Sequence, residues 1–245
     1  MNALLITVRT NSARLPDKAL LKIKGKHTIE YVIANCKKSK LAEKIILCTT
    51  TLKEDEVLCD IAKHHDIECF QGSVKDKLSR WNGACLDFGV DFFVTADGDD
   101  LFCSSELMDL AFDQYRKKKS HFIQAPDVIC GAFAYAIRSD ILRRVCDAKK
   151  INDTEMMWKL FENDFCQIEE LENIPQVYKR KDMRFTLDYQ EDFLFFSKVI
   201  EQLDNSSNTP QIIEYLNSNP ELKDINFFRE RDWELNQEKA IINMS

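Results

Sequence analysis

The sequence predicts an α/β fold with a doubly wound, mostly parallel sheet at its centre. Short apolar runs alternate with segments of helical periodicity through the first 120 residues, and two of these runs end abruptly in charged residues. The composition, 44% hydrophobic with six Gly and five Pro in 245 residues, is that of a globular chain. Alternating strands and helices place helices on both faces of a sheet, which binds ligands at the carboxyl ends of its strands. The polar strand exits at Arg9 and Asp97 are therefore the candidate sites.

The elements of the first half follow from their apolar patterns. Residues 3–8 (ALLITV) are nearly all apolar, as in a strand that is covered on both faces. Further strands of this character are expected over residues 44–49, 67–70 and 91–96. Helices, with apolar residues three or four positions apart, are expected over residues 28–35, 54–65 and 74–88.

The pattern changes after residue 121, where strands and helices no longer alternate regularly. Strands are expected over residues 122–124, 131–137 and 184–188. Helices are expected from Ser139 through Val145, over 152–162, over 191–203, and from Thr209 to a break at Pro220. Because no repeat or flexible linker interrupts the chain, we expect one domain over residues 1–245.

The net charge and the absence of long apolar stretches limit the partners of the protein. The chain carries 34 Lys and Arg against 41 Asp and Glu, a formal charge of -7. Nucleic acids and anionic membranes are bound by basic faces, so neither is an expected partner. No signal peptide pattern or membrane-spanning apolar stretch occurs, which predicts a cytoplasmic protein.

The nine cysteines are spaced at least ten residues apart and lie mostly in apolar segments. No C-x-x-C pair or Cys/His cluster occurs, which argues against a zinc site and against a disulfide framework. We expect buried, reduced thiols.

A cluster of cations follows the first predicted strand. It comprises Arg9, Ser12, Arg14 and Lys18. Backbone amides and the Ser12 hydroxyl can donate hydrogen bonds to a polyphosphate that the cations neutralise; a solvated basic loop is the alternative. The loop contains no glycine, and neither the Walker spacing nor G-x-G-x-x-G occurs. A P-loop kinase and a dinucleotide-dependent dehydrogenase are therefore set aside.

Acidic residues follow two of the predicted strands. Asp97, Asp99 and Asp100 come directly after one apolar run, and Asp188 ends another. Carboxylates this close repel one another unless cations or solvent intervene. Because Mg²⁺ binds one or two carboxylates together with phosphate oxygens and water, Asp97 and Asp188 are candidate ligands of a magnesium ion bridging to a nucleotide. Turn or helix-capping roles are the alternatives.

Several of these stretches resemble one enzyme family. The opening Arg9-x-x-Ser12-x-Arg14-Leu15-Pro16-x-Lys18 resembles the signature of the cytidylyltransferases that make CMP-activated acidic sugars, namely the acylneuraminate and 3-deoxy-manno-octulosonate group and the spore-coat polysaccharide branch. Residues 71–80, 94–97 and 184–192 are similar to that last branch, and residues 212–222 are similar in rhythm to the C-terminus of the family. The likeness spans nearly the whole chain.

The resemblance implies a fold, an organisation and a reaction. The fold would be a Rossmann-like three-layer sandwich with a mostly parallel mixed sheet, as in nucleotide-diphospho-sugar transferases. Residues 1–120 would bind the nucleotide, residues 121–190 would bind the acceptor and mediate a homodimer, and residues 191–245 would form C-terminal helices. CMP would pass from CTP to an acidic sugar or a related sugar acid, phosphate or phosphonate, with release of pyrophosphate, for surface glycan biosynthesis.

The resemblance also implies roles for individual residues. The nucleotide would be bound by Arg9, Ser12, Arg14, Lys18, Gln71, Gly72, Ser73 and Arg80. Mg²⁺ would be held by Asp97 and Asp188, and the acceptor would be bound by Asp99, Asp100, Gly131, Glu155 and Arg184. Arg9, Lys18 and Asp97 would be the catalytic residues, because in-line attack on the α-phosphorus depends on positioning and charge neutralisation and needs no protein nucleophile.

The chain departs from the family pattern at two places. Asn11 and Asp17 stand where relatives often have glycine, and Asp17 adds a negative charge to the phosphate loop. Asp99 and Asp100 stand after Asp97 where many relatives have an apolar residue or proline. The two extra acids would bind a second Mg²⁺ or recognise an amino group on the acceptor.

Two other functions fit parts of the pattern. Asp97-Gly98-Asp99 matches the D-x-D metal motif of a nucleotide-sugar-dependent glycosyltransferase of the related fold. A fold relative without turnover could serve as a scaffold. The cations at Arg9, Arg14 and Lys18 favour an enzyme that releases pyrophosphate, since such an enzyme must neutralise the β- and γ-phosphates.

Overall fold

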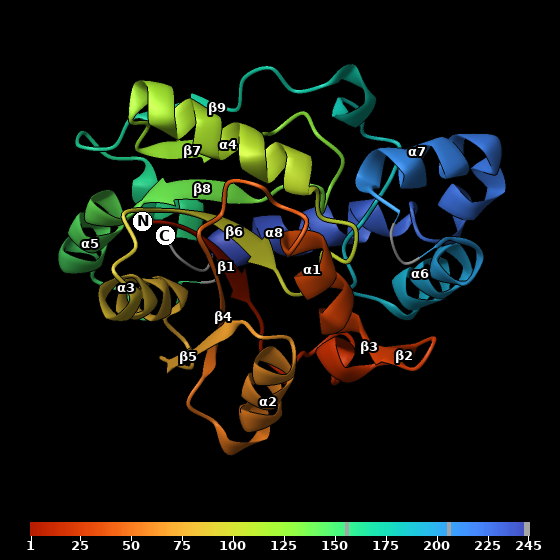
Figure 1. The fold of residues 1–245 in the computed structure, drawn as a ribbon, viewed down its shortest axis with the longest axis horizontal. Coiled ribbons are helices and arrows are strands. Elements are labelled where there is room, and N and C mark those ends of the chain that lie inside the picture. The colour runs from red at the N-terminus through yellow and green to blue at the C-terminus, as the bar shows by residue number, and fades with distance from the viewer. Residues whose placement is uncertain (155–156, 205–206, 243–245) are drawn as a thin grey trace.

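A seven-stranded mixed sheet forms the centre of the protein, as the computed structural model shows for residues 1–154, 157–204 and 207–242. Its parallel part contains, in spatial order, β5 (Glu68–Gly72), β4 (Lys44–Thr50), β1 (Asn2–Thr7) and β6 (Phe92–Asp97). Next to β6 follow β8 (Tyr135–Arg138), β7 (Phe122–Gln124) and β9 (Ile168–Glu170). The strand β8 runs antiparallel to both of its neighbours. This arrangement confirms the predicted α/β fold with a mostly parallel mixed sheet (Figure 1).

Helices cover both faces of the sheet because successive residues of each strand point to opposite faces. Leu4 and Ile6 of β1 pack in one apolar cluster, with α1 (Thr28–Cys36), α2 (Glu56–His64) and α4 (Ser105–Lys118). Ala3 and Leu5 pack in the other, with α3 (Lys77–Phe88) and α5 (Ser139–Ala148). The side chains of Leu4, Leu5 and Ile6 are fully buried, as expected for a strand covered on both faces. The result is a three-layer sandwich.

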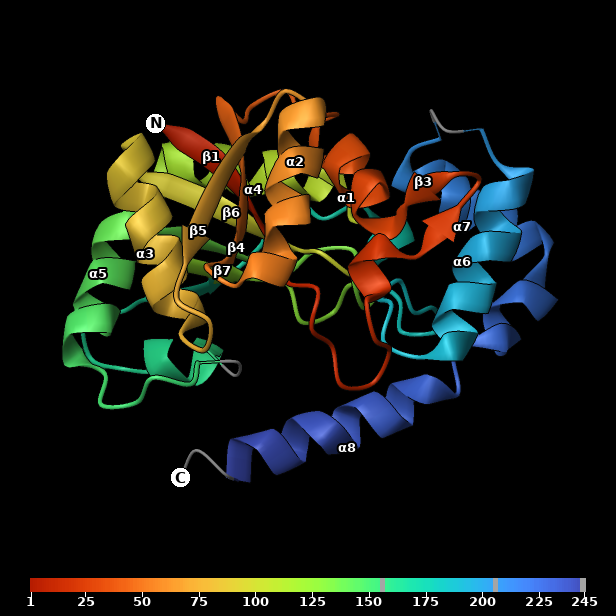
Figure 2. The same cartoon turned by 90° about the horizontal axis from the view of Figure 1, so that it is seen from below.

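The C-terminal part of the chain extends this sandwich at one end. It contains α6 (Gln190–Gln202), α7 (Thr209–Ser218) and α8 (Arg229–Ile242). Figures 1 and 2 show α6 and α7 beside the small hairpin of β2 (Lys22–Ile23) and β3 (Lys26–His27). The predicted helix start at Thr209 is confirmed, since the Asn208 side chain accepts a hydrogen bond from the Gln211 amide as an N-cap.

Three of the predicted elements differ in the structure. Residues 184–188 form no strand: the Phe185 amide donates to the Cys130 carbonyl (2.8 Å) and the Leu187 amide to the Asp99 carbonyl (2.8 Å), so loops satisfy this backbone. Of the strand predicted over 131–137, only the part from Tyr135 onward pairs, as β8. In the region expected to be helical over 152–162, the structure has a 3₁₀ helix at Met157–Phe161.

One disulfide joins Cys59 on α2 to Cys69 on β5, with their Cα atoms 5.4 Å apart. The prediction that all cysteines are reduced is therefore wrong for this pair, while seven cysteines are free thiols. The chain reverses tightly between α2 and β5, with Asp66 in the left-handed conformation (φ 51°). This reversal brings together two cysteines whose spacing in the sequence carries no disulfide signature.

Among the described helices, none has the length and apolar character needed to cross a membrane.

Candidate active site

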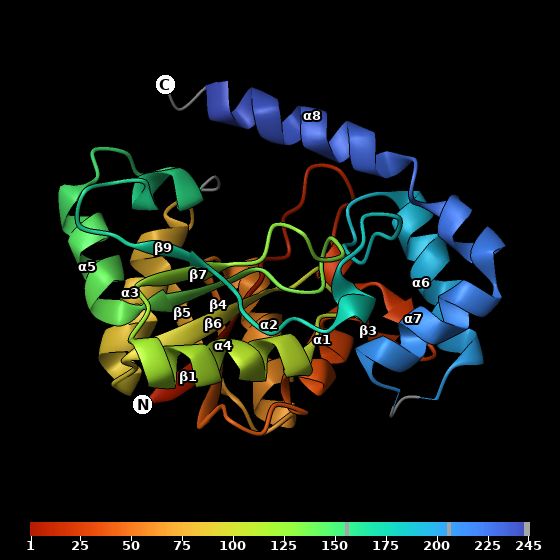
Figure 3. The ribbon, with the colours of Figure 1, turned by 90° about the horizontal axis from the view of Figure 1, so that it is seen from above.

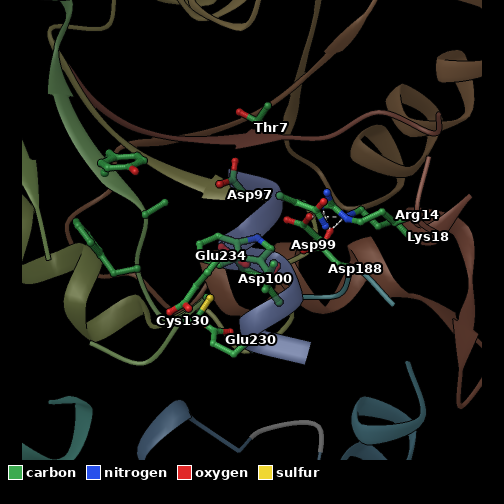
Figure 4. A pocket seen from close by; sticks show the side chains of 18 of the residues that line it. Thr7, Arg14, Lys18, Asp97, Asp99, Asp100, Cys130, Asp188, Glu230 and Glu234 are labelled. Carbon is green, nitrogen blue, oxygen red and sulfur yellow. Dashed lines mark hydrogen bonds and ion pairs between the residues drawn. The ribbon is translucent and has the colours of Figure 1, made fainter. Parts of the chain in front are cut away.

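A cavity of about 1350 Å³ opens at the carboxyl ends of β1 and β6. These strands pair in parallel register with Thr7 beside Asp97, so their ends meet at one edge of the sheet. The cavity walls come from the loop after β1, the end of β6, residues 124–135, residues 181–188 and α8. Figure 4 shows acidic and basic side chains from several of these segments around the same space. The predicted location of the site at the strand exits is thus where the protein has its large cavity.

Most of the residues singled out from the sequence line this cavity. Those that line it are Arg9, Ser12, Arg14, Lys18, Arg80, Asp97, Asp99, Asp100, Gly131 and Asp188. Gln71, Gly72 and Ser73 are not among the lining residues: they lie at and just after the carboxyl end of β5, where the Gln71 side chain donates to the Thr50 carbonyl (3.2 Å). Arg184 lies outside the lining set as well, and Glu155 falls outside the described residues.

The cationic loop after β1 is anchored at both ends. Near its start, the Thr10 amide and hydroxyl both donate to Asp55 Oδ1 (2.7 Å each). Near its end, Asp17 adopts the left-handed conformation (φ 51°), which glycine adopts at no steric cost. This explains why glycine would suit position 17. Lys18 then begins a 3₁₀ helix (Lys18–Leu20) that directs its side chain toward the acids across the cavity.

Lys18 lies at the centre of an ion-pair network. Its Nζ contacts Asp99 and lies 2.8 Å from Asp188 Oδ1, which also accepts from Arg14 Nη2 at 2.5 Å. Burial alone would lower the pKa of Lys18, but the Asp99 and Asp188 carboxylates outweigh burial and raise it. Burial would raise the pKa of Asp188, but Lys18 and Arg14 hold it at about 2. Both groups therefore stay charged at neutral pH.

Asp97 has a different cationic partner. Lys77, in the first turn of α3, places Nζ 2.9 Å from Asp97 Oδ1 and 5.0 Å from the centroid of the Trp81 ring. The Trp81 indole in turn donates to the Thr7 hydroxyl (2.6 Å), which fixes the ring at the end of β1. Lys77 lines the cavity but is absent from the set predicted from the sequence. Lys77 lies within residues 71–80, which resemble the family, but at a position where the resemblance specifies no residue type. The motif therefore did not identify it.

Asp100 is the most enclosed of the three acids after β6, with an exposed fraction of 6%. Burial, together with the charges of Asp99 and Asp97, raises its pKa well above the usual range, and a hydrogen bond with Thr186 only partly opposes this. Gly131 packs directly against it: a Cβ at that position would lie 3.0 Å from Asp100 Oδ1 and 2.6 Å from the Phe185 carbonyl carbon. Gly131, at φ 83°, is therefore required for close packing of the loop.

Arg184 is fully buried beneath the cavity and positions its acids. Its guanidinium lies 3.1 Å from Asp188 Oδ2, 3.1 Å from Asp192 Oδ1 and 2.8 Å from Glu230 Oε2. Arg184 is placed to orient Asp188. Its buried position does not support the expected direct contact between Arg184 and the acceptor. Glu230 belongs to α8, which also brings Trp233 and Glu234 to the cavity, and none of these three was predicted.

The acids of the cavity suit a magnesium ion completed by the substrate. No cluster of three or more His, Cys, Asp or Glu side chains with metal-binding geometry occurs in the described part of the chain. Mg²⁺ does not need such a cage, because it is usually bound by one or two carboxylates with phosphate oxygens and water. Asp97 and Asp188 line one cavity with the cations of the phosphate loop, and the residues present therefore fit the ion.

The cations and carboxylates of this α/β protein meet at the carboxyl ends of its strands, where doubly wound folds bind nucleotides and other ligands. A family model described as cytidylyltransferase matches residues 3–228, so the chain belongs to the cytidylyltransferase family. The family indicated by the sequence motifs is confirmed, and the protein is a nucleotidyltransferase.

Two protein sequences are similar to this chain. An uncharacterized protein of Methanocaldococcus jannaschii is 30% identical over 226 residues, covering 91% of this chain and 93% of the relative. A 3-deoxy-manno-octulosonate cytidylyltransferase of Bdellovibrio bacteriovorus is 24% identical over 148 residues, covering 60% of this chain and 56% of the relative.

Solved structures share the fold. A cytidylyltransferase from Leptospira borgpetersenii has a TM-score of 0.81 at 22% identity, covering 91% of this chain and 96% of that one. The structure of a CMP:2-keto-3-deoxy-manno-octonic acid synthetase complexed with CTP has a TM-score of 0.64 at 13% identity, covering 82% and 98%. Membership of the cytidylyltransferase family favours nucleotidyl transfer over the glycosyltransferase alternative.

Proposed function

We propose that the protein transfers CMP from CTP to an acidic sugar, or to a related sugar acid, phosphate or phosphonate, in a reaction that depends on Mg²⁺ and releases pyrophosphate. The observation that carries the proposal is the contact of Lys18 with Asp188 in a cavity that also contains Asp97. The cations proposed to bind the triphosphate and the acids proposed to bind Mg²⁺ thus line one cavity. The relatives named for cytidylyl transfer to 3-deoxy-manno-octulosonate support the acceptor class, and surface glycan assembly is the corresponding pathway.

The ion pairs of the site suggest how the chain acts on CTP. Lys18 and Arg14 pair with Asp188 and Asp99, and Lys77 pairs with Asp97. Phosphate oxygens of CTP would offer Lys18, Arg14 and Arg9 new partners. Bound Mg²⁺ would supply positive charge at the α- and β-phosphates and would be held by Asp97 and Asp188. The cations on the loop would then stabilise the pyrophosphate as it leaves.

Pyrophosphate release tests the reaction. The protein is incubated with CTP, Mg²⁺ and a panel of acceptors: 3-deoxy-manno-octulosonate, an N-acylneuraminate, a sugar phosphate and a phosphonate. We expect release with CTP and at least one acceptor, and none when CTP is replaced by a UDP-sugar. A protein that binds CTP without releasing pyrophosphate over this panel would contradict the proposed acceptor class.

Two substitutions test the assigned roles. Lys18→Ala should reduce kcat/KM by about 100-fold, because it removes a charge-assisted contact to a reacting phosphate. Lys22→Ala, which changes an exposed lysine on the adjacent hairpin, is the matched control.

Asp97→Asn should abolish Mg²⁺-dependent turnover with a nearly unchanged Tm. Wild-type kinetics of the Lys18 variant would contradict its role, and a large loss of stability in the Asp97 variant would favour a structural role.

A further inference from the structure

Helix α8 lies across the open side of the cavity and outside the part of the chain that the family model matches. The match ends at residue 228, and α8 begins at Arg229. Figures 2 and 3 show α8 apart from the sheet, running from the side of α6 toward the side of α5. Five of its residues line the cavity: Glu230, Arg231, Trp233, Glu234 and Asn236. This helix therefore forms a wall of the cavity from residues beyond the part that the family model matches.

One face of α8 is turned to the cavity. Glu230, Trp233 and Glu234 are spaced i, i+3 and i+4, which places them side by side on a helix. Leu235, one position further, is exposed and is absent from the cavity lining. In the close-up of Figure 4, Glu230 and Glu234 lie in the same space as Asp97, Asp99 and Asp100.

Ion pairs fix this face relative to the reacting end of the site. The buried Arg184 contacts both Glu230 (2.8 Å) and Asp188 (3.1 Å). Arg229 binds the Glu191 carboxylate with two nitrogens, at 2.8 and 3.2 Å, as in a bidentate pair. Asn236 donates to the Tyr189 hydroxyl at 3.1 Å. The first two turns of α8 are thus attached to the segment that carries Asp188.

The cavity lining combines two kinds of chemistry. The phosphate loop contributes Arg9, Arg14 and Lys18, where the triphosphate is expected. Trp233 and Glu234 of α8 share the cavity with Tyr135 and Trp158 from the second half of the chain. Aromatic faces with a few polar groups bind the apolar face of an organic ligand, and a carboxylate accepts hydrogen bonds from its hydroxyl groups. Glu234 is itself paired with Arg231, which also lines the cavity, at 3.3 Å.

From this arrangement, and on the basis of the proposed function, we propose that the inner face of α8 determines which acceptor the enzyme uses. Trp233 packs against the ring of a polyhydroxylated acceptor and Glu234 accepts hydrogen bonds from its hydroxyl groups. Trp233 and Glu234 are thus specificity-determining residues on a helix beyond the part of the chain that the family model matches.

Steady-state kinetics with both substrates varied test this assignment. The enzyme is assayed with CTP, Mg²⁺ and 3-deoxy-manno-octulosonate or an N-acylneuraminate, whichever the wild-type protein uses. Trp233→Ala and Glu234→Gln should each raise the KM for the acceptor by about tenfold, while the KM for CTP changes less than about twofold. Trp233→Phe, which keeps an aromatic ring, should retain most of the acceptor affinity and serves if the alanine variant folds poorly.

The matched control is Leu235→Ala, on the same helix but outside the cavity lining. Calorimetric titration of each variant with CTP and Mg²⁺ reports the nucleotide site separately. Normal CTP binding with an unchanged acceptor KM in both the Trp233 and Glu234 variants would overturn the role of α8 and leave the proposed function intact. Absence of CTP binding by the wild-type protein would overturn both.

Discussion

At the scale of single residues, Lys77 adds a cation that the sequence motifs did not reveal. Its ammonium group lies 2.9 Å from Asp97, on the α3 side of the cavity, whereas Lys18 and Arg14 approach from the loop after β1. If Asp97 binds Mg²⁺ in the complex with CTP, Lys77 would supply a further positive charge beside the ion. We expect two groups of cations to act on the phosphates of CTP.

Substitution of Lys77 by methionine tests this role. We expect kcat to fall by at least about tenfold, because a cation that stabilises charge developing at the α-phosphate is lost. The Tm should change little, since the lysine is partly exposed and the Met side chain can still cover Trp81. Lys75→Met, at an exposed position just before α3, is the control. A variant whose kcat equals that of the wild type would restrict Lys77 to a structural ion pair with Asp97.

Arg9 and Asp97 were detectable from the sequence because they lie at the ends of buried strands, and the carboxyl ends of strands mark ligand sites in this class of fold. Glu230 and Trp233 belong to a helix far along the chain, where both contact the buried Arg184. Contacts of that kind depend on tertiary packing, and no local pattern in the sequence encodes them.

At the scale of elements, the same logic explains which predictions succeeded. The strands β1, β4 and β6 were predicted within two residues because both of their faces are buried, which leaves a continuous apolar run. Residues 184–188 are similarly buried, but their backbone amides bond to neighbouring loops and not to a strand. An apolar run in the sequence therefore predicts that a segment is buried. It does not predict whether the backbone of that segment pairs with a strand, which depends on the tertiary structure.

The disulfide between α2 and β5 makes a prediction about the stability of these two elements. A cross-link that closes a loop of about ten residues stabilises the folded state by about 3 kcal/mol in the chain-entropy model. Urea unfolding of the oxidised protein, with and without reductant, should show a loss of about that size. A Cys59→Ser, Cys69→Ser double variant should not respond to reductant. Equal unfolding midpoints for the oxidised and reduced wild-type protein would show that the bond carries no net stabilisation.

At the scale of the whole molecule, the site brings several negative charges close together, which affects the stability of the fold. Asp97, Asp99, Asp100 and Asp188 line one cavity of a chain whose formal charge is already -7. Lys18, Arg14 and Lys77 neutralise three of these acids directly. Asp100 relies on a hydrogen bond with Thr186 and is nearly inaccessible to solvent. The ionised form of Asp100 is therefore expected to lower the stability of the folded protein.

The pH dependence of global stability follows from the raised pKa of Asp100. A carboxyl with a raised pKa binds its proton more tightly in the folded than in the unfolded state, where the pKa is about 3.9. Its contribution to stability therefore falls as the pH rises from the unfolded toward the folded pKa. Asp100→Asn removes this ionisation while keeping a group that can hydrogen-bond Thr186. In metal-free buffer at neutral pH, the variant should be more stable than the wild type by on the order of 1 kcal/mol.

Urea unfolding at a series of pH values measures this difference. We expect the gain in the free energy of unfolding of Asp100→Asn to be present at pH 7 to 8 and to shrink as the pH falls toward about 4. Asp188→Asn should behave in the opposite way, because the pKa of Asp188 is held at about 2 by Lys18 and Arg14 against the effect of burial. That variant loses stability at neutral pH and approaches the wild type in acid. If the Asp100→Asn variant were less stable than the wild type at neutral pH, the Asp100 carboxylate would stabilise the fold. That result would contradict the prediction that ionised Asp100 lowers the free energy of unfolding.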